Sequence, residues 1–183
     1  MDGLEITMSS ARHLPEDVFL PGGPLQLNLF STTSRKVLKA ALEMANTTSW
    51  DNLRSPHIFM GLLAVPDSSV REWGRKLQAD IPGLLAQFQE LFQQPGNDRH
   101  FLTLHREFLS DSVLRLLRES WQRCKMAGRR RIRPMDLLIC LFTSTNSVVA
   151  ECFERIGLTA AKLTELAVMV ENHEGAAGAE EAA

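Results

Sequence analysis

One nine-residue stretch, Ser55-Pro56-His57-Ile58-Phe59-Met60-Gly61-Leu62-Leu63, constrains most what this chain folds into. Ser55 is of a residue type that caps the free N–H groups of a first helical turn, and Pro56 suits the first helical position. Almost every later residue is apolar. A short helix that is apolar on most sides packs in an interior with other helices around it. The stretch therefore predicts a buried helix inside a helical domain.

The same element occurs again, at Arg133-Pro134-Met135-Asp136-Leu137-Leu138-Ile139-Cys140-Leu141-Phe142. Ile58 aligns with Leu137 at an offset of 137 − 58 = 79. Later apolar positions keep this offset: Val70 with Val149, Leu77 with Ile156, and Leu84 with Leu163. Such self-similarity at a fixed period is the signature of a repeat.

The helices that precede the two motifs align at a different offset, 76, with Val37 matching Val113 and Leu38 matching Leu114. This alignment predicts three extra residues in the second unit, in the loop that contains Gly128.

We expect an all-α fold, a tandem pseudo-twofold repeat of two four-helix units. Proline and glycine before residue 30 predict an irregular arm over 1–29. Repeat 1 is expected at 30–94, a linker at 95–107 and repeat 2 at 108–170. Residues 171–183, rich in glycine, alanine and glutamate, are expected to form a disordered tail or linker.

Composition narrows the class of protein. A net charge of −2 gives no global reason to expect nucleic acid, and no apolar run reaches the roughly 20 residues that span a bilayer. The first residues carry acids where a secretory signal has a basic start, so a cytoplasmic location is expected. The three cysteines, Cys124, Cys140 and Cys152, lack Cys-x-x-Cys spacing and are expected to be buried thiols.

Motifs for catalysis are missing from the sequence. It contains no Gly-x-x-x-x-Gly-Lys-Ser/Thr phosphate loop and no Gly-x-Ser-x-Gly. His57 is expected to be a packed histidine, and His100 and His105 are spaced so that they do not share one helix face. We predict no catalytic residue, no metal site and no cofactor, and therefore not an enzyme.

One charge cluster stands out: Arg129, Arg130, Arg131 and Arg133. A functional interpretation is a basic rim that grips phosphate or an acidic protein surface. The alternative is a solvated loop in which a few arginines pair with nearby acids. Aromatic residues are not interleaved with the cluster, so stacking on single-stranded bases is not indicated.

The repeated unit and its Ser-Pro-His-Ile-Phe-Met-Gly-Leu-Leu motif resemble the Clp N-terminal repeat domain, which precedes the ATPase modules of ClpA, ClpB, ClpC and ClpV and also occurs alone. Ala64–Val70 resembles the turn after the family's motif, and Ile156–Thr159 resembles its Leu-Gly-Val-Asp junction. The resemblance covers about residues 30–170. It implies an all-α module that binds protein segments, with a Clp-type AAA+ ATPase as partner, in cis or in trans.

The chain departs from the family in one functional position. The family often has a glutamate before the motif histidine, which in the ClpC-like branch helps to hold phosphorylated arginine; here that position is Pro56. Phospho-arginine binding is therefore not predicted. One version of the implied role is ClpV-like, with a short helix from a contractile secretion sheath as ligand.

Binding of a partner's helix or extended peptide would use apolar residues left over from the core. We look for them on the two first-helix faces and on the proline-rich arm. The candidates are Phe30, Val37, Leu38, Trp50, Leu53 and Phe108. The alternative function is a nucleic-acid-associated helical protein that uses the Arg129–Arg133 loop.

Overall fold

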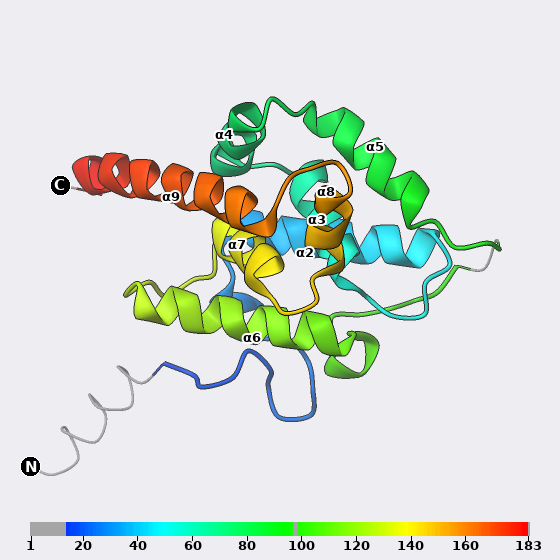
Figure 1. Ribbon diagram of the computed structural model, residues 1–183. Helices are drawn as coiled ribbons and strands as arrows, with labels where there is room; N and C mark the ends of the chain where they lie inside the picture. Colours follow the sequence, from blue (N-terminus) through cyan, green and yellow to red (C-terminus); the bar gives the residue numbers. More distant parts are fainter. Residues whose placement is uncertain (1–13, 97–98, 183) are drawn as a thin grey trace, which may run out of the picture.

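The computed structural model describes residues 14–96 and 99–182 (Figure 1). The first unit holds η1 (Leu27–Leu29), α2 (Thr32–Thr47), α3 (Ser55–Ala64), α4 (Ser68–Lys76) and α5 (Ile81–Leu91). The second holds η2 (Arg106–Phe108), α6 (Asp111–Met126), α7 (Pro134–Thr143), α8 (Val148–Glu154) and α9 (Ala160–Ala182). Within the described residues, β pairing is limited to isolated bridges. The predicted all-α tandem repeat of two four-helix units is confirmed.

A single offset of 79 residues relates the two units. It joins the starts of η1 and η2, of α2 and α6, and of α3 and α7. The predicted offset of 76 for the first helices is wrong: α2 and α6 each have 16 residues, and buried Val37 corresponds to buried Leu116 rather than to Val113. An apolar stripe repeats about every turn, so a slip of three residues superposes one stripe on the next. The loops 48–54 and 127–133 are equal in length.

Side-chain caps set where the helices begin. The hydroxyls of Ser31 and Ser110 accept hydrogen bonds from the third residues of α2 and α6, at 3.1 and 3.3 Å. The start of α3 differs from the prediction, because its N-cap residue is Arg54 and Ser55 is already helical.

The buried helices α3 and α7 lie in the centre of the molecule (Figure 1). Phe59 of α3 packs against four other aromatic rings, with centroid distances from 4.8 to 6.2 Å, those of Trp73, Phe88, Phe142 and Phe153. Gly61 allows α2 to approach closely, since a Cβ there would lie 2.5 Å from the carbonyl oxygen of Val37. The core is therefore shared by both units.

Two reciprocal backbone contacts, which we call the clasps, join the units. In the first, Ser31 N–H donates to Ile132 O at 2.9 Å and Ile132 N–H donates to Leu29 O at 2.7 Å. In the second, Leu53 N–H donates to Phe108 O at 2.8 Å and Ser110 N–H donates to Leu53 O at 2.9 Å. Each unit's entry segment thus pairs with the loop before the other unit's buried helix.

The two ends of the described chain behave differently. The arm that starts at Leu14 lies along α6, where the Trp121 indole donates to Pro15 O at 2.8 Å and Arg118 pairs with Asp17 at 3.1 Å (Figure 1). Residues 171–182, which were expected to belong to a disordered tail or linker over 171–183, are instead the end of helix α9. Alanine is the strongest helix former, and this segment is rich in it.

Candidate functional site

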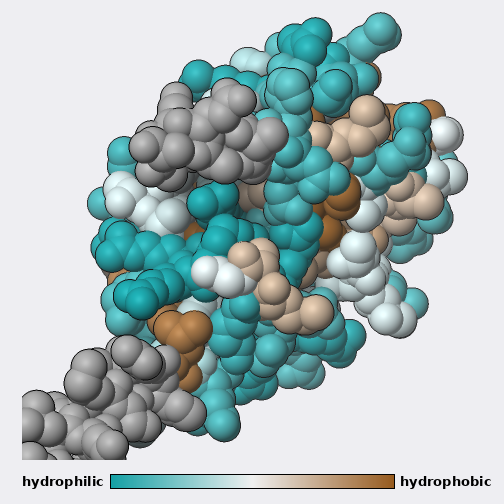
Figure 2. Space-filling view, turned by 90° about the vertical axis from the view of Figure 1, so that its left-hand side faces the viewer, coloured by the Kyte–Doolittle hydropathy of each residue, from teal (hydrophilic) through white to brown (hydrophobic). Residues whose placement is uncertain are grey.

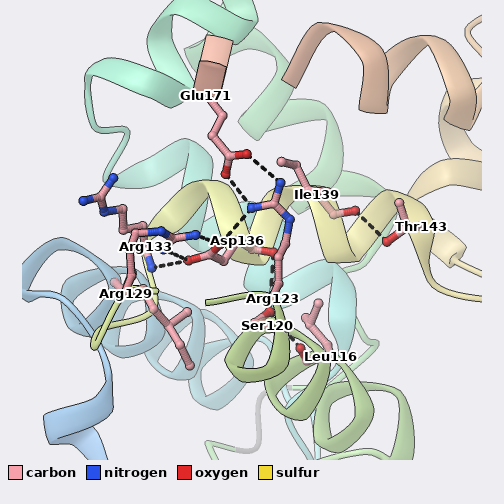
Figure 3. A network of polar contacts seen from close by, with 11 residues as sticks. Leu116, Ser120, Arg123, Arg129, Arg133, Asp136, Ile139, Thr143 and Glu171 are labelled. Carbon is pink, nitrogen blue, oxygen red and sulfur yellow. Dashed lines mark hydrogen bonds and ion pairs between the residues drawn. The ribbon is translucent and has the colours of Figure 1, made fainter. Parts of the chain in front are cut away.

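A charged network, which we call the α7 network, surrounds the start of α7 (Figure 3). The Asp136 side chain is fully buried and accepts from Arg133 N–H at 2.8 Å. The Arg129 guanidinium donates two bonds to it at 2.6 Å, and Arg123 Nη1 donates one at 3.0 Å. Arg123 also donates to both oxygens of Glu171 on α9, at 2.5 and 2.6 Å. The network thus ties α6, α7 and α9 together.

The fully buried Asp136 carboxylate is the centre of this network. A buried carboxylate is tolerated only when it is paired and hydrogen-bonded, and here two guanidiniums face two carboxylates. The hydrogen bonds that Arg123 donates, first to Glu171 and then to Asp136, raise the pKa of Arg123, and the bond that Arg129 donates to Asp136 raises the pKa of Arg129. Removing the fully buried Asp136 carboxylate leaves two partly buried guanidiniums without it, and breaking a buried pair in this way costs about 3–5 kcal/mol.

The start of α3 has the same backbone and different surroundings. His57 stands 79 residues before Asp136, and its Nδ1 accepts from Arg54 N–H at 2.9 Å, as the Asp136 carboxylate does from Arg133 N–H. The residues that correspond to the charged members of the α7 network are apolar: Met44 for Arg123, Trp50 for Arg129 and Phe92 for Glu171. We call Trp50, His57 and Phe92 the α3 cage.

His57 is held in one protonation state. Burial, with the nearby Arg54 charge, lowers its pKa to about 4, so the imidazole is neutral at pH 7. Because Nδ1 is an acceptor, the proton lies on Nε2. That buried N–H has no hydrogen-bond partner among the described residues. An unsatisfied buried donor of this kind costs about 1–3 kcal/mol.

A cavity of about 160 Å³ lies beside His57. The Trp50 ring meets the His57 ring edge-on at 5.1 Å, and the indole N–H donates to Phe92 O at 2.6 Å. The Arg54 guanidinium lies 4.9 Å from the centre of the Trp50 ring, at the cavity's rim. The cavity lining consists of Trp50, Arg54, Ser55, Pro56, His57, Phe92, Ser110, Ser112 and Val148.

A groove of about 810 Å³ lies along α6. Leu114 and the 88 % exposed Met126 give it apolar surface, and Arg115 adds a cation for which the described residues hold no ion-pair partner. The groove is lined by Asp111, Leu114, Arg115, Arg118, Glu119, Gln122, Arg123, Met126, Ala127 and Glu171. Figure 2 shows the side toward which α9 extends: mostly hydrophilic, with apolar residues exposed in separate places.

The candidate partner-binding residues fall into two groups. Phe30, Val37, Leu38 and Leu53 are fully buried and belong to the shared core, so in this conformation they offer no surface to a partner. Trp50 and Phe108 are half-buried. Trp50 belongs to the α3 cage, and Phe108 lies in η2 beside the second clasp.

The four arginines of the predicted basic rim also fall into two groups, one half-buried and three exposed. Arg129 is half-buried in the α7 network, as the interpretation of pairing with nearby acids required. Arg130, Arg131 and Arg133 are exposed. The sequence reasoning did not single out Asp136 or Arg123; the available signal was a lone aspartate within an apolar helix, which needs a buried partner.

Two properties of the described residues bear on reactive chemistry, namely their metal-ligand clusters and the acidity of their thiols. Among them, no group of three or more histidine, cysteine or acidic side chains could hold a metal ion. Burial raises the pKa of the Cys140 thiol to about 11, which disfavours a reactive thiolate. In the same part of the chain, no single helix is both long and apolar enough to cross a membrane.

Comparison with known proteins places this all-α repeat in a family. The model of the Clp repeat N-terminal domain matches residues 29–156, well over half of the chain, so the protein belongs to that family. No curated protein matches the sequence.

Solved structures agree on the fold. The N-terminal domain of the chaperone ClpD from Arabidopsis thaliana has a TM-score of 0.58 at 15 % identity, covering 77 % of this chain and 93 % of that one. The Hsp104 N-terminal domain from Candida albicans has a TM-score of 0.61 at 11 % identity, covering 78 % of this chain and 91 % of that one. A third similar structure is the N-terminal domain of the ClpV1 ATPase from the Sci1 type VI secretion system of E. coli EAEC. Its TM-score is 0.59 at 17 % identity, and the match covers 80 % of this chain and 88 % of that one. Membership in this family supports a substrate- or adaptor-binding module for Clp-type ATPases.

Proposed function

We propose that the protein is a non-enzymatic module that binds a segment of a substrate or adaptor protein for a Clp-type AAA+ unfoldase, in cis or in trans. The observation that carries the proposal is the α6 groove. Its volume suits part of a helix or extended peptide, and exposed Met126 gives it an apolar anchor point. Arg115, which lines the groove and has no ion-pair partner among the described residues, favours an acidic or amphipathic partner.

The ClpV-like version of this role, uptake of a short helix from a contractile sheath, belongs to the same proposal. It is supported by the fold shared with ClpV N-terminal domains. Trp50 and Phe108 stay proposed as further partner contacts, and a cytoplasmic location stays a prediction.

The nucleic-acid alternative rests on the arginine loop, and it is weaker because Asp136 neutralises Arg129. Only Arg130, Arg131 and Arg133 would then serve phosphate contacts from this loop. Binding to duplex DNA that falls steeply with salt would favour this alternative.

A photo-crosslinking amino acid placed at exposed Gln122 tests the groove in cells that make the full chain. The matched control is the same crosslinker at exposed Glu43, which stands 79 residues earlier, on α2. We expect the Gln122 position to trap a defined set of proteins that includes a Clp-type ATPase, its substrate or its adaptor. Charging the anchor with Met126→Asp should abolish that capture.

Equal capture from both positions, or capture that survives Met126→Asp, would remove the groove from the proposal. Recovery of nucleic acid that depends on Arg130 and Arg131 would favour the alternative function instead.

A further inference from the structure

The α3 cavity differs in kind from the α6 groove, with which it shares no lining residue. It lies where two helices begin, because Ser55 and Pro56 open α3 while Ser110 and Ser112 open α6. Both helices direct the positive end of their dipoles to this place. Among the described residues that line the cavity, none is acidic, and Arg54 lies at its rim. The electrostatic environment therefore favours an anion.

A second, independent feature points to a ligand. His57 lines the cavity, its side chain is fully buried, and its Nε2–H lacks a partner among the described residues. Buried polar groups are nearly always hydrogen-bonded, so an orphan donor beside a cavity indicates a site for an acceptor. The hydroxyls of Ser55 and Ser112 could donate to the same group.

The rest of the lining is apolar: Trp50, Pro56, Phe92 and Val148. An apolar cavity of about 150 Å³ is large enough for benzene. At about 160 Å³, the α3 cavity therefore has room for one medium-sized apolar side chain. The ligand must combine an acceptor anion with one apolar group next to it.

We propose that the α3 cavity binds the C-terminus of a polypeptide that ends in an apolar residue. The terminal carboxylate accepts from His57 Nε2–H, from the serine hydroxyls and from Arg54, while the last side chain lies against Trp50 and Phe92. Capture of a C-terminal carboxylate by converging hydrogen-bond donors is a known mode of peptide recognition. The equivalent place in unit 2 does not bind such a ligand, because the carboxylates of Asp136 and Glu171 already pair with the arginines there.

The test compares two probes on the full chain. One is an acetylated tetrapeptide, Gly-Gly-Ala-Leu, with a free C-terminal carboxylate; the other is the same peptide with a C-terminal amide. Binding is followed by NMR through the Trp50 indole N–H resonance. We expect the acid to shift that resonance and to bind at least tenfold more tightly than the amide.

Variants identify the site, and the repeat supplies matched controls. Ser112→Ala and Arg54→Ala should each weaken binding of the acid at least fivefold. Their counterparts 79 residues away, Thr33→Ala and Arg133→Ala, should leave it unchanged. All four positions are at least partly exposed at helix starts, so the fold should persist.

Equal binding of acid and amide, or loss of affinity in the two control variants, would overturn the proposal. So would inorganic phosphate that competes with the peptide and shifts the Trp50 indole resonance equally, since the cavity would then be a general anion site. None of these outcomes bears on the α6 groove, whose test uses Gln122 and Met126.

Discussion

The starts of α3 and α7 are the same structure built twice with opposite chemistry. In both, the third helical residue accepts the N–H of an N-cap arginine, at 2.9 Å from His57 and 2.8 Å from Asp136. Around His57 the neighbours are Trp50 and Phe92, and around Asp136 they are arginines. At a helix start the free backbone N–H groups require an acceptor, but the side chains around that acceptor can differ.

The different neighbours of His57 and Asp136 give the two helix starts different roles. The α7 network satisfies all its members within the chain, and therefore holds α9 against α6 and α7. The α3 cage leaves one donor and one cavity open. Of the two helix starts, the one in unit 2 is therefore satisfied by contacts within the chain, and the one in unit 1 keeps a donor and a cavity for a ligand among the described residues.

The largest effect is expected from Asp136→Asn, which keeps the shape and removes the charge. Arg123 and Arg129 would then remain half-buried with only Glu171 as a counter-charge, and we expect a loss of about 3 kcal/mol in the free energy of unfolding. Urea denaturation at pH 7 measures it.

The control for this change places the residues of unit 1 at the equivalent positions of unit 2. The fourfold variant R123M, R129W, D136H and E171F replaces the network by the uncharged residues that occupy the equivalent positions of unit 1. It should be more stable than Asp136→Asn, because it leaves no charge without a partner. The opposite order would show that packing rather than charge decides stability here.

A smaller effect is expected from pH at the other helix start. The pKa of His57 is about 4 in the folded protein against 6.5 as its ordinary value, so the unfolded chain binds a proton that the folded one excludes. The stabilisation is fully present above pH 6.5 and is lost as the pH falls toward 4, by up to about 3 kcal/mol.

His57→Asn tests this assignment, because its amide oxygen still accepts from Arg54 N–H and does not titrate. Thermal unfolding of both proteins between pH 7 and pH 4 should show a shallower decline for the variant. Parallel curves would mean that other groups carry the pH dependence.

The smallest effect is expected from Glu171→Gln, which weakens the link between α9 and Arg123. Both side chains are partly exposed, so we expect a loss of only about 1 kcal/mol. Amide hydrogen exchange should quicken in α9. Glu165→Gln, at an exposed pair 3.8 Å from Lys162, is the control and should change stability by less than about 0.5 kcal/mol.

Sequence reasoning reached the fold because apolar period, helix caps and the repeated motif all describe local chemistry that packing preserved. It misplaced the register of α2 against α6, since an amphipathic stripe nearly matches itself after one turn. It also placed Phe30, Val37, Leu38 and Leu53 among possible binding residues, because periodicity does not distinguish a core face from a binding face. The α3 cavity needed three-dimensional information, as its walls come from α3, α6 and α8 and from the residues before α3 and after α5.

The clasps between Ser31 and Ile132, and between Leu53 and Ser110, make the halves mutually dependent. A single unit expressed alone would expose its side of both clasps, together with its share of the aromatic cluster around Phe59. Two such copies could pair with each other as the units now do. The repeat thus gives one chain the geometry of a symmetric dimer, and it lets the two units differ at equivalent positions, where a homodimer would have to carry the same residue in both.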